Sequence, residues 1–154
     1  MHLSHLQPFS KQPLLFVTTC TAGRRPLLAA KTSQEILAEI WAKSATLDGW
    51  YVGHYLLMPD HVHFFAMPNI EAKPLAAWMK GWKSISARRI AAASQTAPPV
   101  WQGDYFDHFV RSIAAYRQKW EYVQHNPVRK ELCLQSADWP YQGTLHDLNP
   151  RFAG

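Results

Sequence analysis

The hydrophobic pattern along the chain changes its period several times, and each change marks an expected element. Short apolar runs rich in β-branched and aromatic residues predict strands at 14–21, 50–58 and 61–67. Longer segments with apolar residues every three or four positions predict helices at 32–47, 74–93 and 112–125. The aromatic segment 100–110 is interrupted by Gly103, which favours an extended or irregular course, and we expect the C-terminal tail to be largely irregular.

Turn and cap signals indicate how these elements connect. The Pro59-Asp60 pair predicts a tight turn between the second and third strands. Ser112 is a candidate N-cap of the third helix, and the Asn126-Pro127 pair is its expected stop. The order strand, helix, strand, strand, helix, extended segment, helix predicts an α+β fold, a ferredoxin-like antiparallel sheet with helices packed on one face. Since no internal repeat or linker interrupts the pattern, we expect residues 1–154 to form a single domain.

Composition supports a folded chain. The 154 residues are 47% hydrophobic and include seven tryptophans, which is enough for a sizeable core and too apolar for a disordered chain. No apolar run approaches the roughly 18 to 20 residues that span a bilayer, and the first residues lack the pattern of a signal peptide. We therefore expect a cytoplasmic protein with no membrane contact. Cys20 and Cys133 have no metal-ligand spacing and are predicted to be reduced thiols.

Two histidines separated by one residue open the third predicted strand. Because side chains alternate across a strand, His61 and His63 should point to one face while Val62 points to the other. Imidazole is the commonest nitrogen ligand of transition metals, and Asp60 could orient a ring or add an oxygen ligand. The alternative is a pair of partly buried histidines that only form hydrogen bonds. The spacing by itself leaves both interpretations open.

The third predicted helix carries Tyr122 and Asn126 four residues apart, so their side chains should lie on one helical face. A phenol can act as a nucleophile when a metal or a base activates it, and Asn126 could hold such a metal. Alternatively, the tyrosine packs on the core and the Asn-Pro pair only ends the helix. Spacing alone does not separate Tyr122 from the other candidate tyrosines, Tyr105, Tyr116 and Tyr141.

Four segments occur together in one order: MPDHVHFFAMP at 58–68, VWQGDYFDHFVRS at 100–112, YVQHNPVRKELC at 122–133 and DWPYQG at 138–143. In this combination the chain resembles the REP-associated tyrosine transposases over residues 14 to 143. That family belongs to the single-strand DNA endonucleases with a histidine-hydrophobic-histidine (HUH) motif and one catalytic tyrosine, and it is similar to small transposases of bacterial insertion sequences. The chain departs from the family pattern at Glu131, where glycine is more usual, and at Gln142-Gly143, where serines are. These departures concern substrate contacts or local turns rather than the catalytic positions.

The resemblance implies a site and a mechanism. His61, His63 and Asn126 would bind a divalent cation, Mg or Mn, that polarises a phosphate oxygen of single-stranded DNA. Tyr122 would attack the phosphorus, forming a 5′-phosphotyrosine bond and releasing a 3′-OH, so that the bond energy is kept for strand transfer. The resemblance further implies single-stranded, REP-like palindromic hairpins as the partner, while the oligomeric state stays open between monomer and homodimer. The candidates near in sequence for the base that accepts the tyrosine proton are His125, Asp60 and His108.

Charge fits a nucleic-acid partner. Sixteen Lys and Arg against eleven Asp and Glu give a net charge of +5. The basic residues expected to contact DNA phosphates are Lys80, Lys83, Arg88, Arg89, Arg111, Arg129 and Lys130. Trp78 and Trp82 could stack on bases, but tryptophans on a helix that covers a sheet are usually core, and we favour the core for at least one of them.

Two other functions are compatible with parts of this pattern. A non-catalytic, domesticated domain that binds single-stranded nucleic acid would use the basic and aromatic residues alone. A metal-dependent hydrolase would activate water at the histidine pair and would not need Tyr122. The two alternatives differ from the transposase prediction in that neither forms a protein–DNA bond.

Overall fold

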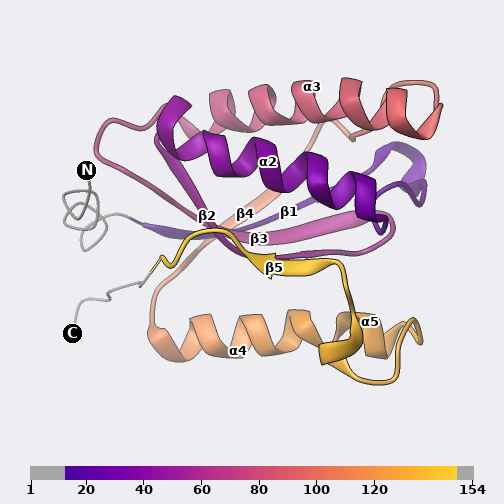
Figure 1. Cartoon of the computed structure of the whole chain (residues 1–154). Coiled ribbons are helices and arrows are strands. Elements are labelled where there is room, and N and C mark those ends of the chain that lie inside the picture. Colours follow the sequence, from indigo (N-terminus) through magenta and orange to yellow (C-terminus); the bar gives the residue numbers. More distant parts are fainter. Residues whose placement is uncertain (1–12, 149–154) are drawn as a thin grey trace.

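The structure, a computed structural model, describes residues 13–148 (Figure 1). Within that range the strands are β1 (Leu14–Cys20), β2 (Trp50–Leu57), β3 (His61–Pro68), β4 (Phe106–Val110) and β5 (Gln142–Thr144). The α-helices are α2 (Lys31–Leu47), α3 (Leu75–Ser94), α4 (Ile113–Gln124) and the single turn α5 (Asn126–Arg129). Short 3₁₀ turns lie at η2 (Ala22–Arg24) and η3 (Ser136–Asp138). No helix among residues 13–148 is long and apolar enough to cross a membrane.

The strands form one antiparallel sheet in the order β4-β1-β3-β2-β5. Strands β1 to β4, with α2 and α3 as connections, follow the β-α-β-β-α-β order of the ferredoxin-like fold. The predicted fold class is therefore confirmed. The aromatic segment forms a strand only from Phe106 onward, and the tail, which we expected to be largely irregular, adds β5 to the outer edge of β2.

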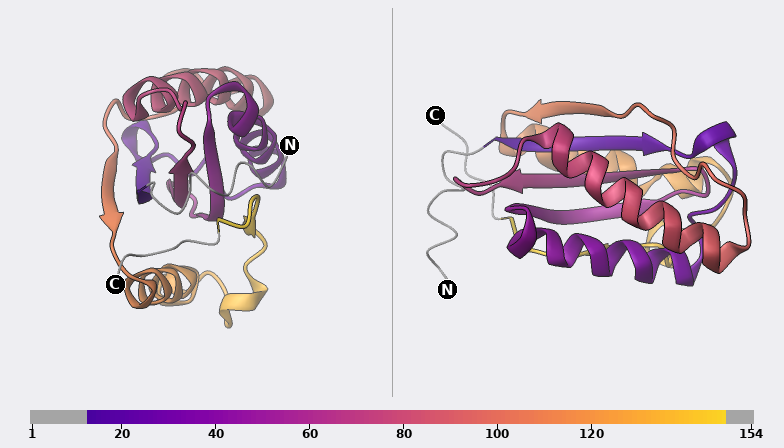
Figure 2. Two further views of the ribbon diagram at one scale, coloured as in Figure 1. Left: turned by 90° about the vertical axis from the view of Figure 1, so that its left-hand side faces the viewer. Right: turned by 90° about the horizontal axis from the view of Figure 1, so that it is seen from above.

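Helices cover both faces of the sheet, not one as the sequence pattern suggested. Helices α2 and α3 lie together on one face, and α4 and α5 lie on the other (Figures 1 and 2). The physical reason lies in β3, where both sets of alternating side chains are apolar from Phe64 onward. Phe64 and Ala66 pack in the α2/α3 layer, while Phe65 and Met67 pack in the α4 layer. A central strand that is apolar on both faces needs cover on both.

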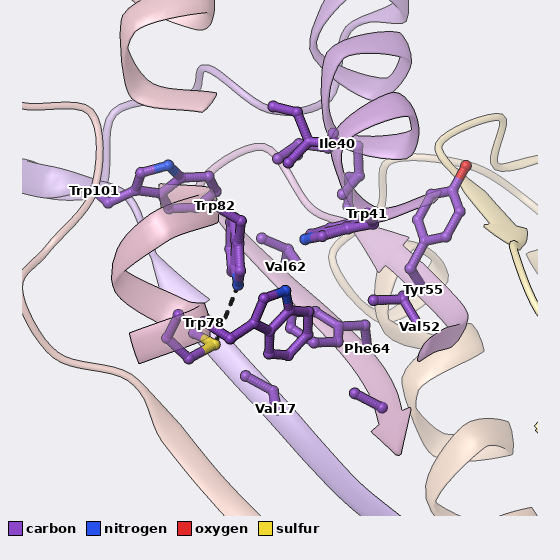
Figure 3. Close-up of a cluster of buried hydrophobic side chains, with 14 of the residues drawn as sticks. Val17, Ile40, Trp41, Val52, Tyr55, Val62, Phe64, Trp78, Trp82 and Trp101 are labelled. Atoms are coloured by element: carbon purple, nitrogen blue, oxygen red, sulfur yellow. Dashed lines mark hydrogen bonds between the residues drawn. The ribbon is translucent and has the colours of Figure 1, made fainter. Parts of the chain in front are cut away.

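The α2/α3 layer is an aromatic core, centred on Phe64 (Figure 3). The rings of Trp41 and Phe64 are 5.0 Å apart, and those of Trp41 and Trp82 are 5.4 Å apart. Trp78 and Trp82 are 1% and 2% exposed, so both belong to the core and neither is available to stack on a base. Trp78 Nε1 donates to Ser44 Oγ and Trp101 Nε1 to Ser86 Oγ, each at 2.9 Å, whereas the buried Nε1 of Trp41 has no hydrogen-bond partner among the described residues.

The connection between β2 and β3 fixes the start of β3. The Met58 amide donates to the His61 carbonyl at 2.8 Å, which closes the predicted turn at Pro59 and Asp60. The buried Trp139 indole donates to the Leu57 carbonyl at 2.9 Å and anchors the tail at the end of β2. The first residues of β3 are therefore held by packing from the tail and by a short turn, and the two candidate histidine ligands lie there.

Candidate active site

The histidine pair projects from the first three residues of β3 into the α4 layer. His61 and His63 lie side by side, with ring centroids 4.8 Å apart, while Val62 between them is buried in the opposite layer. The alternation of side chains along the strand produces this arrangement, as the sequence predicted. The α4 layer is open at this end, since both imidazoles keep partial exposure.

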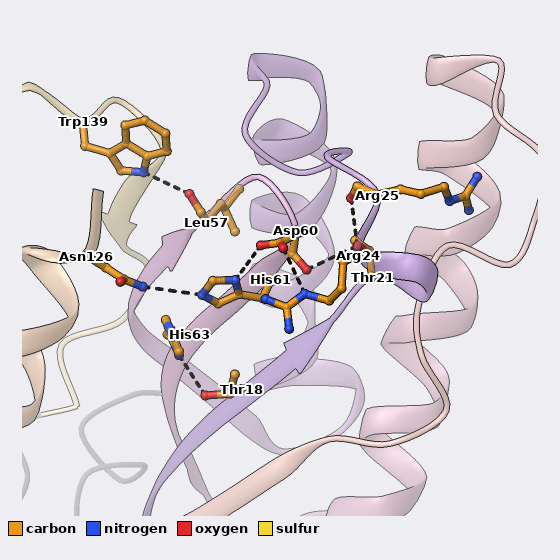
Figure 4. A network of polar contacts seen from close by, with 10 residues as sticks. All are labelled: Thr18, Thr21, Arg24, Arg25, Leu57, Asp60, His61, His63, Asn126 and Trp139. Carbon is orange, nitrogen blue, oxygen red and sulfur yellow. Dashed lines mark hydrogen bonds and ion pairs between the residues drawn. The ribbon is translucent and has the colours of Figure 1, made fainter. Parts of the chain in front are cut away.

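Each imidazole is oriented through its Nδ1 atom (Figure 4). His61 Nδ1 lies 2.8 Å from Asp60 Oδ1, and His63 Nδ1 lies 2.8 Å from Thr18 Oγ1. The second oxygen of Asp60 accepts a hydrogen bond from Arg24 Nε at 2.9 Å. Because a carboxylate only accepts, His61 carries its proton on Nδ1, and its Nε2 is the acceptor that faces Asn126 Nδ2 at 3.5 Å.

Burial keeps both histidines neutral. It lowers the pKa of His61, although Asp60 acts in the opposite direction. It lowers the pKa of His63 to about 3, and charge repulsion from His61, in its protonated form, and from Lys119 adds to the effect. Burial raises the pKa of Asp60, but hydrogen bonds from Arg24 and His61 outweigh it, so the net pKa is lowered and the carboxylate is ionised. Neutral imidazole is the form that binds metals.

Asn126 completes a possible ligand set. It is the first residue of α5, just after α4 ends, and its Nδ2 lies 3.5 Å from His61 Nε2. Within residues 13–148 no three His, Cys, Asp or Glu side chains gather into a metal site, so this cluster offers two imidazoles and one amide. The Asn126 amide presents Nδ2 to His61 and Oδ1 to Arg129, so its oxygen would face a cation only with the amide turned over. Two imidazole nitrogens and an amide oxygen placed in that way suit a divalent cation that leaves positions open for water or substrate oxygen. The residues present therefore fit the metal that the sequence predicted.

Tyr122 lies beside this cluster but not in contact with the histidines. It is 64% exposed on the last turns of α4, and the Arg129 guanidinium lies 3.9 Å from the centroid of its ring. The same guanidinium donates to the Tyr122 carbonyl at 2.8 Å and to Asn126 Oδ1 at 3.4 Å. Arg129, which we expected to contact DNA phosphates, thus links Tyr122 to the Asn126 amide. Among the described residues no hydrogen bond or ring contact joins Tyr122 to His61 or His63.

The other candidate tyrosines are less available. Tyr116 packs with its ring 4.7 Å from that of Phe65, and burial raises the pKa of its phenol. Burial also raises the pKa of Tyr105. Tyr141 packs edge-on against Trp139. Of the four, Tyr122 alone has an exposed side chain, which the sequence could not show.

The three candidate bases differ in their surroundings. Asp60 is engaged by Arg24 and His61, and His108 lies on β4 against the ring of Phe16. His125 lines the same surface hollow as Tyr122, and its Nδ1 donates to the Glu121 carbonyl at 2.9 Å. That hydrogen bond leaves the Nε2 lone pair of His125 free to accept a proton.

A cleft of about 540 Å³ opens next to His61. Arg24, Asp60, Asn126 and Lys130 are among the residues that line it, so two cations face the ligand cluster. Lys130 was predicted to contact DNA, and the structure brings it to the site. Arg24 was not predicted. The signal available for it was the Gly-Arg-Arg sequence that directly follows the first strand.

The remaining basic residues are dispersed. Lys80 and Arg88 are exposed and line a groove between α3 and the segment 98–105. Arg89 pairs with Glu39 at 3.2 Å, and the Arg111 guanidinium lies 5.2 Å from the centroid of the Phe109 ring. The side chains of Arg89 and Arg111 are thus partly engaged within the protein.

Lys83 does not fit the role that the sequence suggested. Its side chain is 9% exposed, and Nζ donates to the carbonyls of Gln102 at 2.7 Å and Asp104 at 3.4 Å. The ammonium holds the 102–104 loop against α3 and is turned away from solvent. A basic position on a helix reads as a surface charge from sequence alone, because the loop that buries it comes some twenty residues later.

Comparison with known proteins places this chain in a family. The sequence model of the family described as "Transposase IS200 like" matches residues 14–126, a range that includes His61, His63, Tyr122 and Asn126. The chain belongs to the IS200-like transposase family. The REP-associated tyrosine transposase of Escherichia coli (strain K12) is 24% identical over 132 residues, covering 85% of this chain and 75% of that protein.

The fold of this IS200-like transposase also matches a solved structure, that of a REP-associated tyrosine transposase bound to a REP hairpin. The TM-score is 0.67 at 21% identity, over 92% of this chain and 86% of the other. At this identity the match shows a shared fold. Together the comparisons confirm the resemblance that the sequence motifs indicated.

Because His63 is largely but not fully buried, we expect the stability of this transposase to depend on pH. Its pKa of about 3 in the folded chain lies below the ordinary value of 6.5, so below pH 6.5 the unfolded chain takes up a proton that the folded chain does not. From pH 8 to pH 5 this histidine alone should lower the free energy of unfolding by about 2 kcal/mol. Urea unfolding in EDTA at both pH values measures the change. His63→Gln, which cannot titrate, should lose about that much less stability than wild type, and equal losses in the two proteins would contradict the assignment.

Proposed function

We propose that this transposase cleaves and rejoins single-stranded DNA at REP-like palindromic hairpins, with Tyr122 as the nucleophile. The observation that carries the proposal is the cluster at the start of β3. Two neutral, oriented imidazoles meet an amide at the end of the helix whose exposed tyrosine lies one turn earlier. That combination suits phosphoryl transfer to a side chain.

His61, His63 and Asn126 would hold the divalent cation, Mg or Mn. When bound, it supplies a positive charge that draws electron density from a phosphate oxygen. Asp60 fixes the His61 ring through Nδ1 and Thr18 fixes the His63 ring through Nδ1, so both rings are set before any ligand arrives. Orientation by such outer partners strengthens ligand binding because the rings do not have to be ordered on binding.

The chemical step exchanges one phosphodiester for another. Tyr122 Oη forms a bond to phosphorus, the bond from phosphorus to the 3′ oxygen breaks, and the released oxygen takes a proton from water to become a 3′-OH. The phenol proton goes to His125 Nε2, which lies in the same hollow. Attack by a free 3′-OH on the phosphotyrosine reverses these changes and joins a new strand, so no nucleotide cofactor is needed.

The hairpin substrate is proposed from the comparison and from charge. The E. coli relative carries the name REP-associated, and the matching solved structure contains a REP hairpin. This chain has a net charge of +5, with Arg24 and Lys130 beside the ligand cluster and with Lys80 and Arg88 on an exposed groove. These four cations are the candidates for phosphate contacts, and such binding weakens as salt rises.

One observation favours a second function. Because Tyr122 makes no contact with the histidines in the free protein, water could occupy the reacting position instead, which would make the protein a metal-dependent hydrolase. The two functions differ in one product, since only the tyrosine reaction leaves DNA covalently attached to protein.

Cleavage of a pooled set of single-stranded hairpins, drawn from palindromic repeats of the source genome, tests the proposal. With Mg or Mn, wild type should form a slow-migrating, protease-sensitive DNA adduct on a denaturing gel. Tyr122→Phe should lower its formation by about 1,000-fold or more because the nucleophile is gone, and His61→Ala should have a similar effect. Tyr116→Phe is the matched control and should stay within a few-fold of wild type. Cleavage that survives in Tyr122→Phe without an adduct would favour the hydrolase, and absence of cleavage by wild type on the whole pool would contradict both.

Metal affinity tests the role of Asp60 separately from cleavage. Asp60→Asn keeps the shape of the side chain but weakens the hold on the His61 Nδ1 proton and on Arg24. Calorimetric titration with Mn²⁺ should show about 10- to 100-fold weaker binding in this variant. Glu39→Gln, which changes a carboxylate on α2 that pairs with Lys43 and Arg89, should bind Mn²⁺ as wild type does. Equal affinities in wild type and Asp60→Asn would show that Asp60 does not support a metal ligand.

A further inference from the structure

Strand β4, at one edge of the sheet, is exposed along most of its length. Four of its five residues are exposed, and Phe106 is the most open of its rings at 72%. A single exposed apolar residue needs no explanation by itself. The exposure of Phe106 matters because of the residues with which it is in register in the sheet.

Phe106 is in register with His63, one of the two candidate histidine ligands. It pairs with Thr18 on β1, and Thr18 pairs in turn with His63 on β3. Side chains of directly paired residues point to the same face, so the three form one row across the sheet. Thr18 also bonds His63 through Oγ1 at 2.8 Å (Figure 4). With strands about 4.8 Å apart, the Cα atom of Phe106 lies about 10 Å from that of His63, two strands away on the same face.

A cation and a second ring flank this row. Lys119 on α4 has its Nζ 5.2 Å from the centroid of the Phe16 ring, in the neighbouring row of the same face. His108, exposed on β4, has its ring 5.5 Å from that of Phe16. The Lys119 charge reaches both His63 and His108, since it contributes to the lowered pKa of each, after burial. Lys119 therefore lies between the histidine pair and the open side of β4.

The acidic residue of this strand points away. Asp107 pairs with Val17, which is buried in the α2/α3 layer, so strand alternation directs Asp107 to the opposite face. The face with Phe106 thus combines an exposed ring and a lysine with no carboxylate from β4. Exposed aromatic rings beside cations are the usual composition of surfaces that bind single-stranded nucleic acid, where bases stack on rings and phosphates meet the charge.

We infer that Phe106 is a stacking platform for an unpaired base of the DNA strand, next to the phosphate held at the histidine pair. The inference rests on the proposed function for the identity of that phosphate. The strand would run from the cleft beside His61, past His63, to Phe106, with Lys119 meeting its backbone. A nucleotide held at both ends of this row is positioned for attack, and this platform reads single-stranded DNA that flanks the hairpin rather than the duplex stem.

Binding measured in EDTA tests the platform without any cleavage. The probes are a hairpin with short unpaired flanks on both sides, with 2-aminopurine placed in the flanks, and the same hairpin without flanks. Phe106→Ala should weaken binding of the flanked hairpin by about 5- to 150-fold and abolish the fluorescence change that accompanies stacking. It should leave binding of the unflanked hairpin unchanged. Phe106→Trp should restore both readings.

Phe109→Ala is the matched control, because Phe109 is 50% exposed on the same strand but pairs with Leu15, whose side chain lies in the α2/α3 layer. It should bind both probes within about two-fold of wild type, a difference that is small against base stacking. Equal effects of Phe106→Ala on both probes, or no effect, would overturn the inference. A lower molecular mass of Phe106→Ala than of wild type, measured by light scattering, would also overturn it, because it would identify the β4 edge as a contact between protein copies. Success here together with failed cleavage would contradict only the proposed function.

Discussion

The structure depends on the alternation of side chains along β3. This strand lies inside the sheet, with β1 and β2 on its two sides, and both of its faces must be covered. Even-numbered residues from Val62 to Ala66 fill the aromatic core under α2 and α3. Odd-numbered residues begin with two histidines and continue as Phe65 and Met67 under α4. The same packing that stabilises the fold therefore brings a polar pair to the end of an otherwise apolar layer, where it is partly desolvated.

Desolvation then determines the chemistry of the pair. Burial makes protonation of His61 and His63 unfavourable, and the hydrogen bonds to Asp60 and Thr18 satisfy one nitrogen of each ring. With the proton on Nδ1, the Nε2 of each neutral ring is the nitrogen that can bind a ligand. Helix α4 covers the apolar part of the same layer and ends at Gln124, two residues before Asn126, so the length of this helix decides that the amide meets His61. Tyr122, one turn earlier, is held through Arg129, which contacts both residues.

Local patterns predicted what depends on local physics. The period of the hydrophobic residues indicated the main helices and strands, and strand alternation placed His61 and His63 on one face. The sequence did not indicate that α4 lies on the opposite face from α2 and α3, because that choice depends on how β3 is packed on both sides. Lys83 and Arg24 show the same limit. One is buried by a loop and the other reaches Asp60, and both partners are distant in sequence. Spacing alone likewise did not separate Tyr122 from the other tyrosines; the family motif selected it, and in the structure its exposure distinguishes it from them.

The central claim is that Tyr122 becomes covalently joined to DNA during cleavage. The most direct measurement is tandem mass spectrometry of the trapped adduct after protease and nuclease digestion, which locates the modified residue. The account predicts one modified peptide, with a nucleotide attached through its 5′ phosphate to the Tyr122 oxygen. A nucleotide on Tyr116 or Tyr141, or cleaved DNA with a free 5′ phosphate and no modified peptide, would contradict it.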